Sequence, residues 1–325
     1  MMRYLLRRLA HALLLILGVS VLAFLFAALA PGNYFDEMRL NPQIAPETLT
    51  ALRVQYELDR PLPLRYASWV NSVLHGQLGF SFAYNSPVAP LLLVRAKNTL
   101  LLTVTATLLA WAIALPLGVW SAERLGLLPD RVISWGTATL LVIPDLALAL
   151  GLLVLAVRTH RFPTGGMVSL DFQSLSAAGK IRDLAAHMAL PVAALVLSSL
   201  PLLVRHVRAA VAEVLQAPFL LAAEGHGIPR LTLLFRYALL AAANPLLSLF
   251  GFSIGALLSG SLLIEVVMSW PGLGPFLLEA ILARDIYVVI GGVLFSTIFL
   301  AAGNFLADMF LYWLDPRIRA ESAPR

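Results

Sequence analysis

Long apolar runs, separated by shorter segments that carry most of the charged residues, are the dominant pattern of this chain. Six runs are long enough to cross a bilayer, which takes about 20 residues of helix. They occupy residues 9–30, 99–120, 132–157, 187–204, 239–268 and 286–314. We therefore predict six membrane-spanning helices, and an even number of spans places both termini on the same side of the membrane.

Composition agrees with this prediction and excludes several other classes. Hydrophobic residues make up 60% of the chain and charged residues 13%, and the mean hydropathy is +0.85, as expected for a polytopic membrane protein. The net charge of +5 does not indicate nucleic-acid binding, because the arginines stand in short groups at the ends of the apolar runs, where they orient a membrane protein. Because the chain has no cysteine, disulfides, thiolate metal sites and cysteine nucleophiles are excluded.

The positions of the arginines predict the orientation of the spans. Arg3, Arg7 and Arg8 precede the first run, and Pro31 directly after it disfavours cleavage as a signal peptide. We therefore predict a retained anchor with its amino terminus in the cytoplasm. The loop 205–238, which carries four arginines, is then cytoplasmic, and both termini are cytoplasmic as well.

The segment 31–98 falls on the opposite, extracytoplasmic side and has a helical pattern of its own. Residues 46–53 begin with proline and an acidic residue, which is typical of a helix start. Residues 64–74 form an amphipathic pattern that predicts a second helix at the membrane surface. We interpret this segment as a small cap, find no internal repeat, and predict one all-α domain over residues 1–325.

The cytoplasmic loop contains a stretch of small residues, Leu221-Ala222-Ala223-Glu224-Gly225-His226-Gly227-Ile228. Ala222 and Ala223 predict a short helix whose backbone a partner can approach closely, and Gly227 predicts a turn. Taken alone, the stretch is also typical of a compact connection between two membrane helices.

Short motifs around the six runs carry a family resemblance that extends nearly from end to end. In chain order they are Leu17-Gly18-Val19-Ser20, Pro31-Gly32, Leu58-Asp59-Arg60-Pro61-Leu62, Gly76-Gln77-Leu78-Gly79-Phe80-Ser81, Asn98-Thr99-Leu100, Pro116-Leu117-Gly118, His187-Met188-Ala189-Leu190-Pro191, Trp270-Pro271-Gly272-Leu273-Gly274 and Asp315-Pro316-Arg317. The chain resembles the permease subunits of ABC importers of the dipeptide, oligopeptide and nickel group. The resemblance implies a six-helix bundle of the type I importer class in a bacterial inner membrane.

The resemblance also implies a role for the small-residue stretch. Permeases of this family carry a cytoplasmic Glu-Ala-Ala motif, followed after three residues by Gly, that forms a coupling helix seated on the ATP-hydrolysing subunit. The corresponding docking residues here are Leu221, Ala222, Ala223, Glu224 and Gly227. Leu221 replaces the usual acidic residue and cannot make its charged contact, so Glu224 is the alternative for that contact.

The family resemblance further implies an outer gate that contacts an extracytoplasmic solute-binding protein. The residues assigned to it are Glu265, Trp270, Pro271, Gly272 and Gly274. An equally open alternative for Glu265 is a carboxylate at the membrane interface. The implied partners are a second homologous permease, two ATP-binding subunits that use ATP and Mg, and the binding protein itself; no cofactor or metal is expected on this chain.

A pathway for the solute is predicted from polar and small residues inside the apolar runs. Gly251, Gly255 and Ser259 recur every four residues, with Ser248 nearby, a pattern that favours either close helix packing or a pathway wall. Asp145, after Pro144 in the third run, is an ionisable group at membrane depth. It could contact a cationic end of the solute or a metal ion, pair with a partner subunit, or be a hydrated structural residue.

Enzymatic functions find little support in the sequence. The chain has no phosphate-binding Gly-x-x-x-x-Gly-Lys-Ser/Thr loop and no His-Glu-x-x-His motif, so we predict no catalytic residue. Three hypotheses remain: an ATP-driven importer of di- or oligopeptides, nickel or another small solute; a gradient-driven secondary transporter; and a membrane-embedded enzyme. A secondary transporter would more often show two similar halves and paired charges within the membrane, which this sequence lacks.

Overall fold

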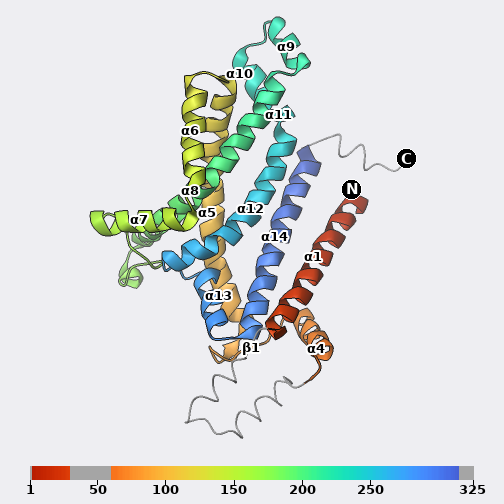
Figure 1. Cartoon of the computed structure of the whole chain (residues 1–325), viewed down its shortest axis with the longest axis vertical. Helices are drawn as coiled ribbons and strands as arrows, with labels where there is room; N and C mark the ends of the chain where they lie inside the picture. Colours follow the sequence, from red (N-terminus) through yellow and green to blue (C-terminus); the bar gives the residue numbers. More distant parts are fainter. Residues whose placement is uncertain (1, 30–59, 315–325) are drawn as a thin grey trace. The chain divides into compact units, whose positions relative to one another are not determined.

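The computed structural model describes residues 2–29 and 60–314, and these are almost entirely helical (Figure 1). The helices are α1 (Met2–Leu29), α4 (Leu62–Leu74), α5 (Val88–Glu123), α6 (Leu128–Val142), α7 (Asp145–Thr159), α8 (Ala177–Leu215), α9 (Pro218–Gly225), α10 (Arg230–Thr232), α11 (Leu239–Ala241), α12 (Ala243–Val267), α13 (Leu273–Leu282) and α14 (Ile286–Leu314), with a 3₁₀ turn η1 (Phe172–Ser174), a π-helical segment η2 (Leu233–Ala238) and two short strands, β1 (Phe80–Ser81) and β2 (Ser86–Pro87). The helix predicted at 46–53 lies outside the described residues.

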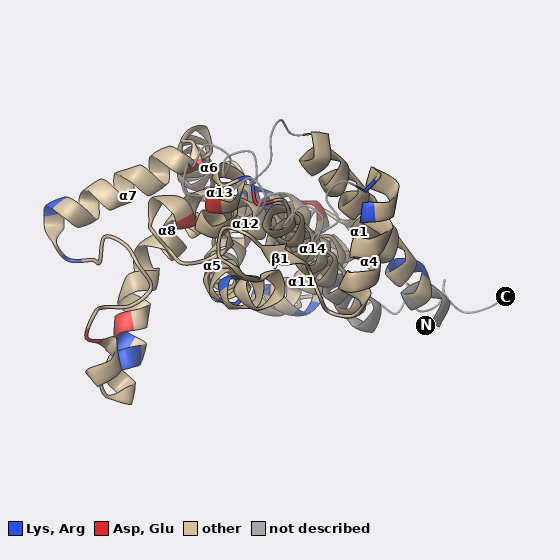
Figure 2. Cartoon of the chain, turned by 90° about the horizontal axis from the view of Figure 1, so that it is seen from below, with Lys and Arg blue, Asp and Glu red and all other residues tan. Residues whose placement is uncertain are grey.

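Five of these helices, α1, α5, α8, α12 and α14, are long and apolar enough to span a membrane, and α6 with α7 forms a sixth candidate that is bent by 96°. Figure 2 shows that most of the helical ribbon consists of residues other than Lys, Arg, Asp and Glu. The basic residue of α7, Arg158, lies in the last turn of that helix. The single span predicted at 132–157 is therefore corrected to a broken one. Pro144 explains the break, because proline lacks an N–H and forces the preceding Ile143 into extended backbone at φ −80° and ψ 119°.

The chain packs as two compact units, which are described separately below. Of the described residues, unit 1 comprises 2–9, 100–270 and 302–314, and unit 2 comprises 10–29, 60–99 and 271–301. The assignment of residues 1–325 to one domain stays a prediction.

The core of unit 1 depends on a row of small residues along α5. Ala106, Ala110 and Ala114 follow one another at four-residue intervals and are fully buried, so they occupy one face of the helix. Gly118 continues the row, and a Cβ atom added there would lie only 2.6 Å from the Val207 side chain on α8. This face lets α5 approach its neighbours closely, which is how membrane helices gain packing energy in lipid.

A buried carboxylate joins three helices at another point of unit 1. Asp130, near the start of α6, is 3% exposed and accepts hydrogen bonds from Arg208 of α8 at 2.5 and 2.9 Å. The Ser121 hydroxyl of α5 donates at 2.6 Å and the Gly126 N–H at 2.8 Å. Four donors therefore satisfy both carboxylate oxygens, as a buried charge requires.

In unit 2, α4 confirms the amphipathic helix predicted at 64–74. Its Trp69 is buried and donates a hydrogen bond from Nε1 to the Leu78 carbonyl at 3.3 Å. Phe24 of α1 packs against Trp69 and Tyr66, with ring centroids 5.9 and 5.5 Å apart. The Tyr66 and Ser20 hydroxyls lie 2.8 Å apart in a hydrogen bond, so aromatic packing and one polar contact hold α4 to α1.

A two-stranded antiparallel hairpin of β1 and β2 was not predicted, because strands of two residues show no alternation of polar and apolar positions. Fully buried Asp285, between α13 and α14, fixes the hairpin by accepting hydrogen bonds from the Ser81 hydroxyl at 2.7 Å and the Ala83 N–H at 3.1 Å. The Tyr84 hydroxyl donates to Glu279 of α13, and burial together with this bond raises the pKa of Tyr84 to about 12. The phenol therefore stays a donor at neutral pH.

We expect Asp130→Asn to destabilise the protein by about 2–3 kcal/mol, because it removes the charge that compensates a partly buried arginine. The measurement is the thermal unfolding of the purified chain in detergent. Asp171→Asn, which changes an exposed carboxylate, is the matched control and should unfold like the wild type. Equal stability of the two variants would contradict a stabilising role for the Asp130 network.

Candidate functional site

The short helix and turn predicted in the loop 205–238 are confirmed. Helix α9 starts at Pro218, a residue suited to the first helical position. It ends in a turn in which the Gly227 N–H donates to the Glu224 carbonyl at 2.9 Å. Gly227 has φ +77°, the left-handed conformation that side chains disfavour, and open space surrounds the position of a Cβ atom. The turn therefore needs glycine for its backbone conformation and leaves its outer surface free.

Helix α9 has one buried and one exposed apolar side. Leu220 is 4% exposed, whereas its neighbours Phe219 and Leu221 are 53% and 54% exposed. Ala222, Glu224 and Gly227 are also exposed and Ala223 is half-buried. The predicted docking residues thus come together on one accessible helix and turn that also presents exposed apolar side chains, as interaction surfaces do.

The charged residues near α9 are paired within the chain. Glu224 Oε1 lies 3.2 Å from Arg230 Nη1, and Arg230 Nε lies 3.5 Å from Glu123 Oε1 at the end of α5. More than half of the Glu224 and Arg230 side chains is exposed, so this pairing contributes little stability. A partner that recruits Glu224 as its charged contact would have to compete with Arg230.

Buried Leu220 connects α9 to the membrane helices of unit 1. It belongs to one apolar cluster with Val207 and Val211 of α8 and with Leu233 and Leu234 of η2. The same cluster contains Val119 of α5 and Leu246 of α12. Helix α9 therefore packs against α8 and η2, and the apolar cluster that it joins extends to α5 and α12.

A cavity of about 200 Å³ lies among α7, α8 and α12 of unit 1. Asp145, the first residue of α7, lines it and accepts a hydrogen bond from the Ser198 hydroxyl of α8. Ser199 and Ser253 add two further hydroxyl groups, and the Ser253 hydroxyl also accepts a hydrogen bond from the Trp111 indole at 3.0 Å. The remaining wall is formed by Leu195, Leu202, Leu203, Leu249, Phe252, Ala256, Leu257 and Gly260.

Of the predicted pathway residues, Asp145 lines this cavity, and the four on α12 do not. Gly251 and Gly255 are buried, whereas Ser248 and Ser259 are exposed elsewhere on the helix. The Gly251 carbonyl would lie 4.0 Å from a Cβ atom at Gly303 of α14, as expected for close packing. The pathway role of these four residues stays a prediction.

Sequence reasoning missed the serines that line the cavity. Ser198 and Ser199 are adjacent in the middle of an apolar run. Two neighbouring hydroxyl groups in such a run could have indicated a polar site. Ser253 lies two residues after Gly251, and it lines the cavity because of the way α12 is rotated about its axis. A sequence pattern fixes that rotation poorly when nearly all positions are apolar.

The predicted outer gate is largely buried. Glu265 and Trp270 are both 0% exposed, and the Trp270 N–H donates to the Glu265 carbonyl at 2.8 Å. The Glu265 side chain is therefore enclosed by protein, and its position at the membrane interface stays a prediction. A direct contact of these two side chains with a binding protein would require their exposure, and that role stays a prediction.

The rest of the predicted gate belongs to unit 2. The Pro271 carbonyl accepts a hydrogen bond from the Asn98 amide at 2.8 Å, and the Leu273 N–H donates to the Thr99 hydroxyl at 2.8 Å. Gly272 and Gly274 are buried. Among residues 2–29 and 60–314, no group of three or more His, Asp or Glu side chains is placed to hold a metal ion.

Comparison with known proteins identifies the class to which this arrangement corresponds. The model of the family described as binding-protein-dependent transport system inner membrane component matches residues 114–320, and a model of the N-terminal part of such membrane components matches residues 1–103. The oligopeptide transport system permease protein AppB of Bacillus subtilis is 31% identical, and the dipeptide transport system permease protein DppB of Escherichia coli is 32% identical. Both similarities cover 98% of this chain and 99% of the relative.

A solved structure has a similar fold. An inward-facing conformation of the MetNI methionine ABC transporter superimposes with a TM-score of 0.53 over 69% of this chain and 96% of the compared chain, at 16% sequence identity. At this identity the comparison supports the helical importer fold alone.

The neighbouring leucines of α9 provide a matched test of the packing. We expect Leu220→Ala to lower the free energy of unfolding by about 2–4 kcal/mol, because it leaves a void in the apolar cluster. Leu221→Ala should change it by about 0.5 kcal/mol or less, because that side chain is half exposed. Thermal unfolding of the purified variants measures both effects, and similar losses at the two positions would refute the difference between the two sides of α9.

Proposed function

This chain belongs to the family of binding-protein-dependent transport system inner membrane components, and from that premise we propose that it imports di- and oligopeptides. It is the membrane permease subunit of an ABC importer and is not an enzyme, because ATP is hydrolysed by separate subunits of such systems. The observation that carries the peptide assignment is the match, over 98% of the chain, to permeases named for dipeptides and oligopeptides. Nickel or another small solute is the alternative cargo.

The proposed assembly contains a solute-binding protein, a second homologous permease and two ATP-binding subunits, with ATP and Mg bound in the latter. The cavity at Asp145 supports the second permease, because Asp145 is exposed in the single chain and a charge at membrane depth needs a polar or aqueous surrounding. A second chain facing α7, α8 and α12 would enclose it. The proposed orientation places both termini and α9 in the cytoplasm.

In this assembly α9 docks on an ATP-binding subunit through Phe219, Leu221 and Ala222. The exposed apolar side chains of α9 support this role, because burying them in a groove of the partner removes them from water. Leu221 supplies an apolar contact where the family usually has an acidic residue. Glu224, engaged with Arg230, is a second candidate for polar contact.

Alternating access follows from the connection between α9 and the cavity. When the two ATP-binding subunits close on ATP, they displace α9, and the cluster around Leu220 carries this displacement to α8 and α12. These two helices, with α7, line the cavity, so their movement exposes Asp145 to one side of the membrane or the other. Hydrolysis of ATP returns the inward-facing state.

Asp145 and the three serines give the cavity a chemistry suited to peptides. A carboxylate can pair with the amino-terminal ammonium of a peptide, and the hydroxyls of Ser198, Ser199 and Ser253 can bond to its amide groups. The rest of the wall is apolar and has no polar group that would select one peptide side chain over another. The cavity thus fits the parts that all short peptides share.

ATP-driven uptake of a mixed peptide pool into vesicles, with the partner subunits present, tests the importer function. We expect uptake to require ATP. In Gly227→Trp it should fall by about tenfold or more, because the large side chain would block the docking surface and a central contact of the interface would be lost. Gly136→Trp adds the same side chain at an exposed glycine of α6 with open space around it and is the control.

Uptake by this chain alone, without ATP, would overturn the proposal in favour of a gradient-driven carrier. Stimulation of ATP hydrolysis by the binding protein without peptide uptake would retain the importer and assign the cargo to nickel or another solute. Equal uptake by Gly227→Trp and Gly136→Trp would remove the docking role from the α9 turn.

Asp145→Asn tests the chemistry of the cavity. We expect a loss of about tenfold in the apparent affinity for a dipeptide with a free amino terminus, because a charge-assisted hydrogen bond is lost. Uptake of the N-acetylated dipeptide should be equally weak in wild type and variant. An equal loss for both peptides would instead make Asp145 a structural residue of the α6–α7 break.

A further inference from the structure

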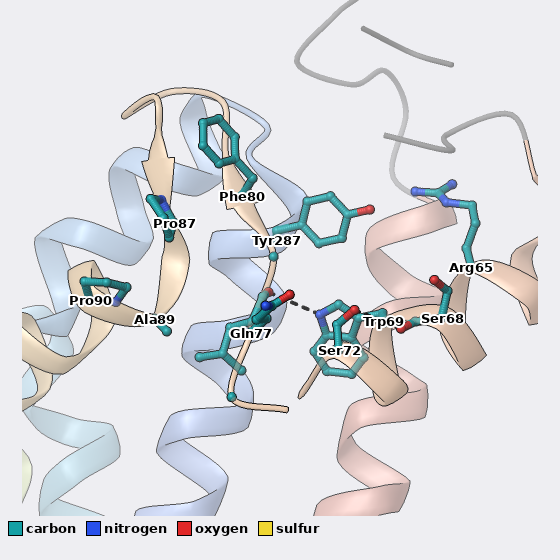
Figure 3. Close-up of a pocket in the computed structure, with 13 residues that line it drawn as sticks. Arg65, Ser68, Trp69, Ser72, Gln77, Phe80, Pro87, Ala89, Pro90 and Tyr287 are labelled. Atoms are coloured by element: carbon teal, nitrogen blue, oxygen red, sulfur yellow. Dashed lines mark hydrogen bonds between the residues drawn. The ribbon is translucent and has the colours of Figure 1, made fainter. Parts of the chain in front are cut away.

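Unit 2 contains a cavity of about 670 Å³ whose lining includes none of the residues predicted for the solute pathway (Figure 3). Its walls are α4, the segment leading into β1, the start of α5 and the first turn of α14. The volume lies in the range of about 300–1,000 Å³ that is typical of sites for small organic ligands. The cavity is therefore large enough for a ligand rather than for a few water molecules.

One face of α4 places polar groups along this cavity. Arg65, Ser68 and Ser72 follow one another at three- and four-residue spacing and all line it, so they share one side of the helix. Figure 3 shows them on the α4 side, with the phenol of Tyr287 pointing across the cavity toward them. The Gln77 side chain adds an amide.

Arg65 is the group that indicates the charge of the ligand. Its Nε is buried and has no hydrogen-bond partner among the described residues, and its guanidinium carbon lies 5.9 Å from the centroid of the Phe24 ring. A buried guanidinium donor without an acceptor is unfavourable, and a phosphate or carboxylate of a ligand would supply the acceptor.

The stretch of the chain that begins at Arg60 has the same sign of charge. Residues 60–99 contain four Lys and Arg residues and no Asp or Glu, so this stretch contributes no carboxylate of its own to pair with Arg65. Among the residues that line the cavity, Arg65 is the one that carries a charge. Basic pockets beside membrane helices are typical of sites for anionic lipid headgroups.

The apolar surroundings favour a lipid over a soluble anion. Trp69 lines the cavity, and its indole N–H is already bonded to the Leu78 carbonyl, so its ring forms an apolar wall. Phe24 beneath Arg65 belongs to α1, whose Leu17, Val21 and Leu25 are exposed and would face acyl chains in a membrane. Unit 2 also has an apolar groove of about 470 Å³ between α1 and α14.

We propose that this cavity binds the phosphate of an anionic phospholipid headgroup, with Arg65 as its principal ligand and Ser68 and Gln77 as additional donors. The acyl chains lie along the exposed apolar surface of α1. Bound lipid holds α4 against α1 in addition to the contact between Phe24 and Tyr66. Recognition by phosphate and negative charge makes the site selective for phosphatidylglycerol over phosphatidylcholine.

Native mass spectrometry of the full chain tests the site with phosphatidylglycerol as the probe. We expect Arg65→Gln to weaken retention of phosphatidylglycerol by about tenfold, the effect of losing a charge-assisted hydrogen bond, and Arg65→Lys to lose less. Arg95→Gln is the control, because Arg95 is in the same unit, lies over the Phe276 ring at 5.8 Å and does not line the cavity. It should retain the lipid like the wild type.

Unchanged retention in Arg65→Gln, or an equal loss in Arg65→Gln and Arg95→Gln, would overturn the proposal. Displacement of phosphatidylglycerol by an equal concentration of inorganic phosphate would assign the site to a free anion instead of a lipid. Equal retention of phosphatidylcholine and phosphatidylglycerol by the wild type would also overturn it, since the guanidinium site requires a net negative headgroup. Thermal unfolding of each variant shows that the folded chain is compared in every case.

Discussion

The insertion of Leu220 into an apolar cluster is the interaction on which the proposed coupling of α9 to the membrane helices depends. One residue of α9 is buried among Val207, Val211, Leu233 and Leu234, while its neighbours on both sides are exposed. Leu220 thus holds α9 to the rest of unit 1, while the side chains beside it stay exposed. Without this burial, α9 would be a surface turn, and the proposed movement of an ATP-binding subunit would have no packed route to the cavity at Asp145.

The break between α6 and α7 is the second determinant of the site. Pro144 ends α6, and the 96° bend starts a new helix at Asp145, whose carboxylate then lies against Ser198 on α8. In a straight span, Asp145 would lie in the middle of the helix and not at the start of a new one. The small residues of α5 and the buried pair of Asp130 and Arg208 pack helices of the same unit. The cavity beside the bend combines Asp145 and three serines with an apolar wall.

Features that depend on a local sequence pattern could be predicted from the sequence. Features that depend on contact between distant segments could not. The apolar runs predicted the spans, and the Ala222–Gly227 stretch predicted both the helix and the turn. The direction of the Asp145 side chain and the serines beside it depend on a proline break and on helix rotation, which an almost uniformly apolar sequence leaves open. Burial of Glu265 and the partnership of Asp130 with Arg208, 78 residues apart, likewise arise from tertiary packing.

The most direct test measures whether the contact of α9 with the membrane helices controls the distance between α8 and α12 across the cavity. The natural chain has no cysteine, so spin labels at Leu202→Cys and Phe252→Cys, two exposed residues of the cavity wall on α8 and α12, report one distance without background. With the partner subunits assembled, the account predicts that ATP changes this distance in the otherwise natural sequence and changes it much less when Leu220→Ala is added. The same ATP-dependent change in both proteins would contradict transmission through Leu220.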